Sequence, residues 1–108
     1  KPEVAPIKVG VFPLMEKDGL DDLARRIYEG VHSHRVEAYY DGSGTIGKRY
    51  ARMDEIGTPW CITVDYDSLQ EGTVTIRDRD TKEQKRIAVD DVPAVIDSLI
   101  AGKPFAQL

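Results

Sequence analysis

Cysteine is nearly absent from this sequence: among 108 residues, only Cys61 carries a thiol. One cysteine cannot form an intrachain disulfide or a cysteine-rich zinc site, so nothing indicates an oxidising compartment and we expect a cytoplasmic protein. Long apolar runs are also lacking, and none approaches the roughly 20 residues that a membrane-spanning helix needs. We therefore expect no contact with a membrane, and one compact domain covering residues 1–108.

An excess of basic residues is missing too. Fifteen Lys and Arg against 19 Asp and Glu give a net charge of −4, which argues against the non-specific nucleic-acid binding typical of basic domains. Residues 45–89 nevertheless balance eight basic against eight acidic side chains, so the whole deficit lies elsewhere. The chain opens Lys1-Pro2-Glu3 without a methionine or a signal-peptide pattern, which suggests a domain cut from a longer protein or a processed product.

The sequence does contain a regular alternation of strand and helix patterns. Strand patterns lie at residues 6–12, 36–40, 60–64, 73–77 and 86–89, and helix patterns lie at 19–33, between Thr45 and Gly57, and from Asp90 to Ile100. Asp18, Thr45 and Asp90 are the expected N-caps. The last two strands read as an antiparallel hairpin joined through residues 80–82. The order β-α-β-α-β-β-β-α predicts an α/β domain whose first strands are parallel and whose last strands are antiparallel.

A glycine-rich turn stands between the second strand and the second helix. Residues 42–47 match G-x-G-x-x-G, and Asp65 and Asp67 follow about 20 residues later, where a ribose-binding acid would be sought. A dinucleotide fold needs a long series of parallel βαβ units, whereas this chain soon turns antiparallel. The turn is therefore better explained as a helix start, with nucleotide binding kept as an alternative that a thermal-shift screen would expose.

Catalytic and metal-binding patterns are weak. His32 and His34 are two residues apart at a helix end, so they point to different faces and cannot chelate one metal from a continuing helix. Cys61 lies inside an apolar strand without a basic neighbour to activate it, which favours a core residue over a nucleophile. We expect no catalytic residue, no metal and no cofactor in this domain.

Charged residues of both signs follow the glycine-rich turn. The second helix carries Lys48, Arg49, Arg52, Asp54 and Glu55, and Arg77, Asp78 and Arg79 end a later strand. Helical spacing predicts that Arg52 faces outward with Lys48 and Glu55. A solvated, ion-paired surface is one interpretation. The other is single-stranded RNA recognition, because arginine planes stack on bases while acids and arginines pair with base edges.

The central stretch "GTIGKRYARMDEIGTP", with "TVDYD", "VTIRDRD" and the first strand "IKVGVFPL", resembles the C-terminal anticodon-binding domain of class IIa aminoacyl-tRNA synthetases. Within that class it is most similar to the glycyl-tRNA synthetases of the archaeal and eukaryotic type. The resemblance implies a mixed five-stranded sheet flanked by three helices. It also implies that the eight charged residues named above form the anticodon-binding surface.

The same resemblance implies the partners. This domain would dock the anticodon loop of glycine tRNA, while a separate catalytic domain, with ATP and Mg²⁺, would charge the tRNA within a homodimeric glycine–tRNA ligase. Glycine codons are GGN, so two anticodon bases are cytosine, and cytosine needs an acceptor for its amino group and a donor for its ring edge. The alternative is a non-catalytic, synthetase-like accessory or coactivator module that binds protein or another nucleic acid.

Overall fold

The computed structural model describes residues 7–33 and 36–108. The strands are β1 (Val9–Pro13), β2 (Ala38–Tyr40), β3 (Trp60–Val64), β4 (Thr73–Asp78) and β5 (Gln84–Ala88), and the α-helices are α1 (Leu20–Ser33), α2 (Ile46–Glu55), α3 (Tyr66–Glu71) and α4 (Val92–Ile100). The strands form one sheet in the order β2-β1-β3-β4-β5. β2, β1 and β3 are parallel, and β4 is antiparallel to both of its neighbours. The predicted mixed five-stranded α/β fold is confirmed.

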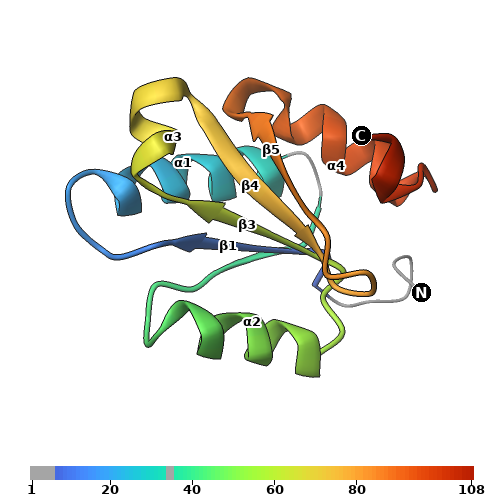
Figure 1. Cartoon of the computed structure of the whole chain (residues 1–108), viewed down its shortest axis with the longest axis horizontal. Helices are drawn as coiled ribbons and strands as arrows, with labels where there is room; N and C mark the ends of the chain where they lie inside the picture. The colour runs from blue at the N-terminus through green and yellow to red at the C-terminus, as the bar shows by residue number, and fades with distance from the viewer. Residues whose placement is uncertain (1–6, 34–35) are drawn as a thin grey trace.

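The sheet is covered differently on its two faces. Helices α1 and α4 lie over one face and α2 lies over the other (Figure 1). The larger core lies under α1 and α4 and combines buried residues of both helices with apolar side chains of β1, β3 and β4. A smaller core of Phe12, Met53 and Cys61, flanked by Ile46 and Tyr50, fixes α2 to the sheet. Burial of these apolar faces is the main force that holds each helix in place.

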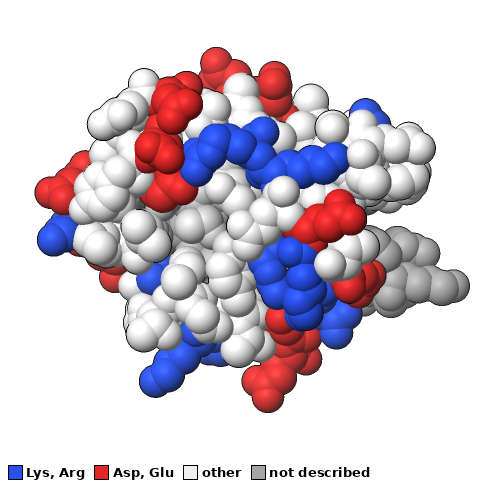
Figure 2. All heavy atoms as spheres, viewed as in Figure 1, with Lys and Arg blue, Asp and Glu red and all other residues white. Residues whose placement is uncertain are grey.

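Helix α2 covers only part of its face of the sheet. The strand register places Cys61 opposite Arg77 and Thr63 opposite Thr75, and Thr75 opposite Arg86, so these side chains share the face on which Cys61 contacts α2. Over β4 and β5 this face carries half-buried or exposed polar side chains. An open half-sheet therefore lies beside α2, and in this view charged side chains of both signs surround a neutral area (Figure 2).

Of the three predicted N-caps, the structure confirms Thr45 but neither Asp90 nor Asp18. Thr45 is the N-cap of α2, and its hydroxyl accepts a hydrogen bond of 3.3 Å from the Lys48 backbone N–H. Asp90 is not a cap, because it lies in the 3₁₀ turn Val89–Asp91 before α4. Asp18 lies two residues before α1 in the left-handed region (φ 58°), and its carboxylate accepts a hydrogen bond from Tyr66 instead of capping the helix.

Several strand boundaries also differ from the predictions: β2 begins at Ala38 and not at residue 36, and β5 spans Gln84–Ala88 and not residues 86–89. Pro13 belongs to β1, as its last residue, and the predicted start of this strand at residue 6 lies outside the described residues, as does His34. Helix α3 was not predicted at all. It begins at a capping box in which the Asp65 carboxylate accepts from the Ser68 N–H and the Ser68 hydroxyl accepts from the Asp65 N–H, and it ends at Gly72 with φ 67°.

Candidate functional site

One group of the predicted site residues gathers where the end of α2 meets the β4–β5 hairpin. The Asp54 carboxylate lies between two cations, 3.3 Å from Arg77 Nη1 and 3.5 Å from Lys82 Nζ. The Asp54 backbone carbonyl accepts a hydrogen bond of 3.1 Å from Arg79 Nε. The Arg77 guanidinium also lies over the Tyr50 ring, 4.6 Å from its centroid. Helix α2 is thus tied to the hairpin by charged and aromatic contacts at once.

Asp78 shapes the turn of this hairpin. Its Oδ1 accepts hydrogen bonds from the backbone N–H groups of Asp80 and Thr81, at 2.9 and 3.1 Å. Such a local bond is typical of an aspartate that holds a turn. We call Asp54, Arg77, Asp78, Arg79 and Lys82 the hairpin cluster.

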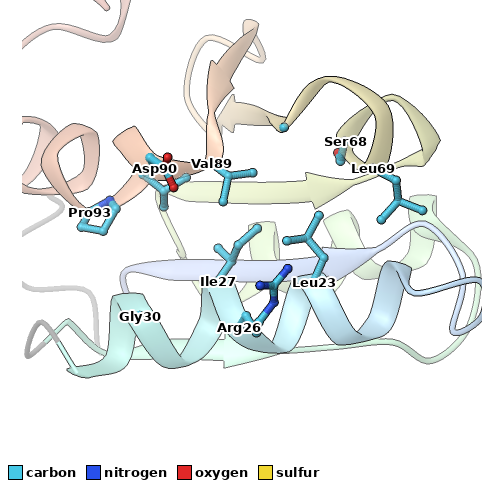
Figure 3. Close-up of a pocket in the computed structure, with 11 residues that line it drawn as sticks. Leu23, Arg26, Ile27, Gly30, Ser68, Leu69, Val89, Asp90 and Pro93 are labelled. Atoms are coloured by element: carbon cyan, nitrogen blue, oxygen red, sulfur yellow. The ribbon is translucent and has the colours of Figure 1, made fainter.

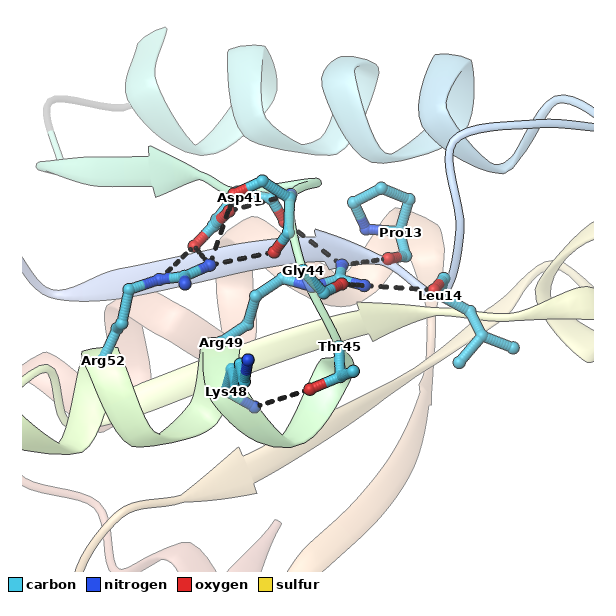
Figure 4. A network of polar contacts seen from close by, with 9 residues as sticks. Pro13, Leu14, Asp41, Gly44, Thr45, Lys48, Arg49 and Arg52 are labelled. Carbon is cyan, nitrogen blue, oxygen red and sulfur yellow. Dashed lines mark hydrogen bonds and ion pairs between the residues drawn. The ribbon is translucent and has the colours of Figure 1, made fainter.

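Arg52 belongs to a different neighbourhood. Its Nε and Nη2 donate to Asp41 Oδ2 at 3.0 and 2.6 Å, and Nη2 also donates to the Ser43 carbonyl at 2.9 Å (Figure 4). The Asp41 side chain is only 5% exposed, whereas that of Arg52 is 45% exposed. Burial raises the pKa of Asp41, but hydrogen bonds from Arg52 and Ser43 outweigh it and hold the pKa below its usual value. Arg52 is therefore committed to an ion pair and does not simply face outward.

Arg49 is an interior residue, 2% exposed. Its Nη1 donates to the carbonyls of Pro13 and Asp41, and its Nη2 donates to those of Leu14 and Gly44 at 3.1 and 3.3 Å (Figure 4). These four acceptors occupy the end of the guanidinium, which leaves no surface for a ligand. The interpretation of Arg49 as an RNA-contacting residue does not fit this placement. We call Asp41, Arg49 and Arg52 the turn network.

The structure therefore divides the predicted site. Arg52 and Asp54 differ by two positions, which places them about 200° apart around α2. Arg52 contacts the turn after β2, while Asp54 contacts the hairpin. Lys48 and Glu55 are exposed on the outer side of the helix, between these two groups. The eight residues do not form one patch.

The open half-sheet adds residues that sequence reasoning missed. Arg86 donates to Asp65 Oδ2 at 2.6 Å and to the Thr73 hydroxyl at 2.8 Å. Burial raises the pKa of Asp65, but the hydrogen bond from Arg86 and those from Ser68 outweigh it, so the pKa lies below its usual value. The period-two alternation of β4 and β5 could have found Arg86, because it predicts that Arg86 shares one face with the threonines opposite it.

The weaker candidates have structural roles. In the glycine-rich turn, Gly44 serves the turn itself, because it has φ 74°, whereas a Cβ on Gly42 would meet only the flexible Glu16 side chain, 2.5 Å away. Asp65 caps α3. His32 stacks on the Tyr28 ring, with centroids 5.7 Å apart. Cys61 is buried, as predicted, and burial raises the pKa of its thiol to about 12.

A groove of about 500 Å³ opens elsewhere, between α1, α3 and the start of α4 (Figure 3). Its walls are mostly apolar, with Leu23 and Ile27 from α1 facing Leu69 and Pro93, and Arg26 and Asp90 are its charged residues. None of the predicted site residues lines it. Within the described part of the chain, no cluster of three His, Cys, Asp or Glu residues could hold a metal ion, and no helix is long and apolar enough to cross a membrane.

These features describe a mixed α/β domain that carries α2 on one face of its sheet, with acids and arginines beside an open half-sheet. Comparison with known sequences identifies its family. The family described as "Anticodon binding domain" matches residues 8–99, and the chain belongs to this family.

Individual relatives support the same placement. A glycine–tRNA ligase of Rhodopirellula baltica is 55% identical over 97 residues, and one of Methanothrix thermoacetophila is 52% identical over 101 residues; these alignments cover 90% and 94% of this chain. The chain spans only about 18% of the length of either relative. The prolyl-tRNA synthetase of Cryptosporidium parvum, solved with L-proline and AMP, shares the fold with a TM-score of 0.86 over 93% of this chain and 22% of its own, at 19% identity.

Proposed function

We propose that this domain binds the anticodon loop of glycine tRNA and positions the tRNA for aminoacylation by a catalytic domain elsewhere in a longer, cytoplasmic, homodimeric glycine–tRNA ligase. ATP and Mg²⁺ would bind only in that catalytic domain. Two findings support the proposal: membership of the anticodon-binding family, and about 50% identity to enzymes named glycine–tRNA ligase. The domain itself supplies recognition, so it should form no glycyl-adenylate from glycine and ATP.

The observation that carries the proposal is the pairing of Asp54 with Arg77. A carboxylate oxygen and a guanidinium nitrogen stand 3.3 Å apart at the border of the open half-sheet. Cytosine presents an amino donor next to a ring acceptor, so an acid and an arginine side by side match its edge. Uracil presents a carbonyl oxygen in place of the amino group, which would face the carboxylate unfavourably.

The aromatic and guanidinium surfaces around this pair fit an unstacked loop. Tyr50 and Arg77 already stack on each other, and Arg86 lies further along the same face. Bases of single-stranded RNA stack on such planes, while their edges remain free for hydrogen bonds. The proposed RNA surface therefore comprises the hairpin cluster, the outer residues Lys48 and Glu55, and the open half-sheet.

The test is a comparison of stem-loops that differ at one anticodon base. Replacing either cytosine by uracil is expected to weaken binding by about 1–3 kcal/mol at fixed salt. Because one domain of net charge −4 makes few phosphate contacts, absolute affinity should be low, and fluorescence anisotropy in low salt suits the measurement. Equal affinity for the two RNAs would show that this surface only positions the loop.

Amide variants then identify the reader. Asp54→Asn offers a donor as well as an acceptor, so it should reduce the preference for cytosine over uracil. Asp78 and Glu55 are two further candidate readers, but Asp78 Oδ1 is occupied by two backbone N–H groups. Glu29→Gln, at an exposed position of α1 over the other face of the sheet, is the matched control and should leave the preference unchanged. The opposite result, with Glu55→Gln effective and Asp54→Asn silent, would move the reading site to the outer side of the helix.

A further inference from the structure

Burial of the charged Arg49 side chain costs folding free energy. Its guanidinium is buried, and within the described residues no carboxylate lies within ion-pair distance of it. Its Nε has no hydrogen-bond partner in the structure. Burying a cation costs free energy, and well-packed apolar residues often replace buried charges without loss of stability. Some property other than stability therefore accounts better for an arginine at this position.

The property that arginine supplies here is a rigid link between two segments. Its planar fork holds the carbonyls of Pro13 and Leu14 at the end of β1, and those of Asp41 and Gly44 in the turn before α2 (Figure 4). A lysine has a single ammonium group and cannot satisfy four acceptors in this geometry. Arg49 thus fixes the start of α2 relative to the sheet.

The C-terminal half of α2 packs closely against β1, so the placement of Asp54 depends on the position of the whole helix. A Cβ added to Gly10 of β1 would lie 3.1 Å from Met53 Cγ and Sδ, so α2 already rests against the strand. Asp54 follows Met53 on the same helix, while its partner Arg77 belongs to β4. The separation of Asp54 from Arg77 therefore depends on where α2 lies over the sheet.

We propose that Arg49 is a positioning residue for cytosine discrimination: by clamping the turn before α2 to the end of β1, it holds Asp54 against Arg77. This inference rests on the proposed function. Arg49 acts through Asp54 and touches no RNA itself. Its removal should weaken the preference between bases more than it weakens the overall attachment of the loop.

The test uses Arg49→Lys, which keeps the charge and removes the fork. Wild-type discrimination between cytosine and uracil stem-loops should be about 5- to 150-fold, and Arg49→Lys should reduce this ratio at least threefold at a temperature where circular dichroism shows the variant to be folded. Arg26→Lys is the matched control, because Arg26 is exposed on α1 across the sheet, and it should leave the ratio unchanged.

A double variant separates positioning from simple destabilisation. If Arg49 acts through Asp54, then Arg49→Lys combined with Asp54→Asn should discriminate no worse than Asp54→Asn alone. A merely structural role would lower the melting temperature and leave the ratio of the two affinities unchanged, which would overturn the inference. Equal affinity of the wild type for the cytosine and uracil stem-loops would overturn this inference alone, whereas failure of the wild type to bind either stem-loop would overturn the proposed function as well.

A second variant keeps the test decisive if Arg49→Lys does not fold. Gly10→Val places a branched side chain where a Cβ alone would lie 3.1 Å from Met53 Cγ and Sδ, so the variant crowds α2 without touching the turn network. It should also reduce the ratio. An unchanged ratio in folded Gly10→Val would show that the placement of α2 does not set discrimination, and the inference would fail.

Discussion

The ion pair between Arg52 and Asp41 allows a sharp prediction about stability. Replacing an exposed helical residue by alanine usually changes the free energy of unfolding by no more than about 0.5 kcal/mol. Arg52 is nearly half exposed, yet it donates two hydrogen bonds, of 3.0 and 2.6 Å, to a carboxylate that is only 5% exposed. Arg52→Ala should therefore leave a nearly buried anion with the hydrogen bonds from Ser43 alone.

The magnitude follows from the partner that remains. Hydrogen bonds to a charged group contribute about 1.5–3 kcal/mol, and a buried group left without its partner loses stability on a similar scale. The open side of Arg52 lets water reach the carboxylate, which places the expected cost near the lower part of this range, at about 2 kcal/mol. For a domain of this size that corresponds to a fall in melting temperature of about 8 °C.

Urea unfolding followed by circular dichroism measures this cost. Lys48→Ala is the control, because Lys48 lies on the same helix with an exposed side chain, and it should cost within about 0.5 kcal/mol. Asp41→Asn with Arg52→Ala completes a double-mutant cycle, whose coupling should be about 1–2 kcal/mol. If Arg52→Ala costs no more than Lys48→Ala, the pair is a solvated surface contact and the assignment of a structural role to Arg52 is wrong.

Three further outcomes are expected. Asp41 and Asp65 have pKa values below the ordinary 3.8. The stability that they provide is therefore present above about pH 4 and is lost as the pH falls through their folded-state pKa values. Urea unfolding between about pH 2 and 6 should show this loss of stability, and Asp65→Asn should make the loss smaller. Cys61, with a thiol pKa of about 12, should react with Ellman's reagent only after unfolding. Tyr50→Phe removes the 2.5 Å hydrogen bond to the Thr63 hydroxyl and should cost about 1 kcal/mol in a thermal melt.

The sequence predicts the sheet and the long helices because their periodic apolar residues are dictated by burial. Strand β3 is fully buried and reads as a continuous apolar run, and α1 places an apolar stripe on the sheet. Helix α3 escapes the same reasoning since its six residues are too few to form a stripe. Only local signals indicate this helix: an aspartate three residues before Ser68 and a glycine after the last turn.

The candidate site was harder to predict because the charge of a residue and its position on the helix can point to opposite faces. Arg49 follows Ile46 by three residues and precedes Met53 by four, so helical spacing alone places it on the buried face. Its charge suggested the surface instead. The pairing of Arg52 with Asp41, and of Asp54 with the hairpin, depends on the position of α2 over the sheet, which no local pattern in the sequence specifies.

Ion pairing within the domain explains how a chain of net charge −4 can suit RNA. Among the proposed contact residues, Arg77 and Lys82 already share Asp54, and Arg86 already holds Asp65. A phosphate that approaches these cations competes with a carboxylate at short range, so non-specific attraction stays small. A base edge that offers both a donor and an acceptor can bond to the acid and the arginine together without separating them. Charge balance in this surface therefore favours recognition of base edges over attraction of the backbone.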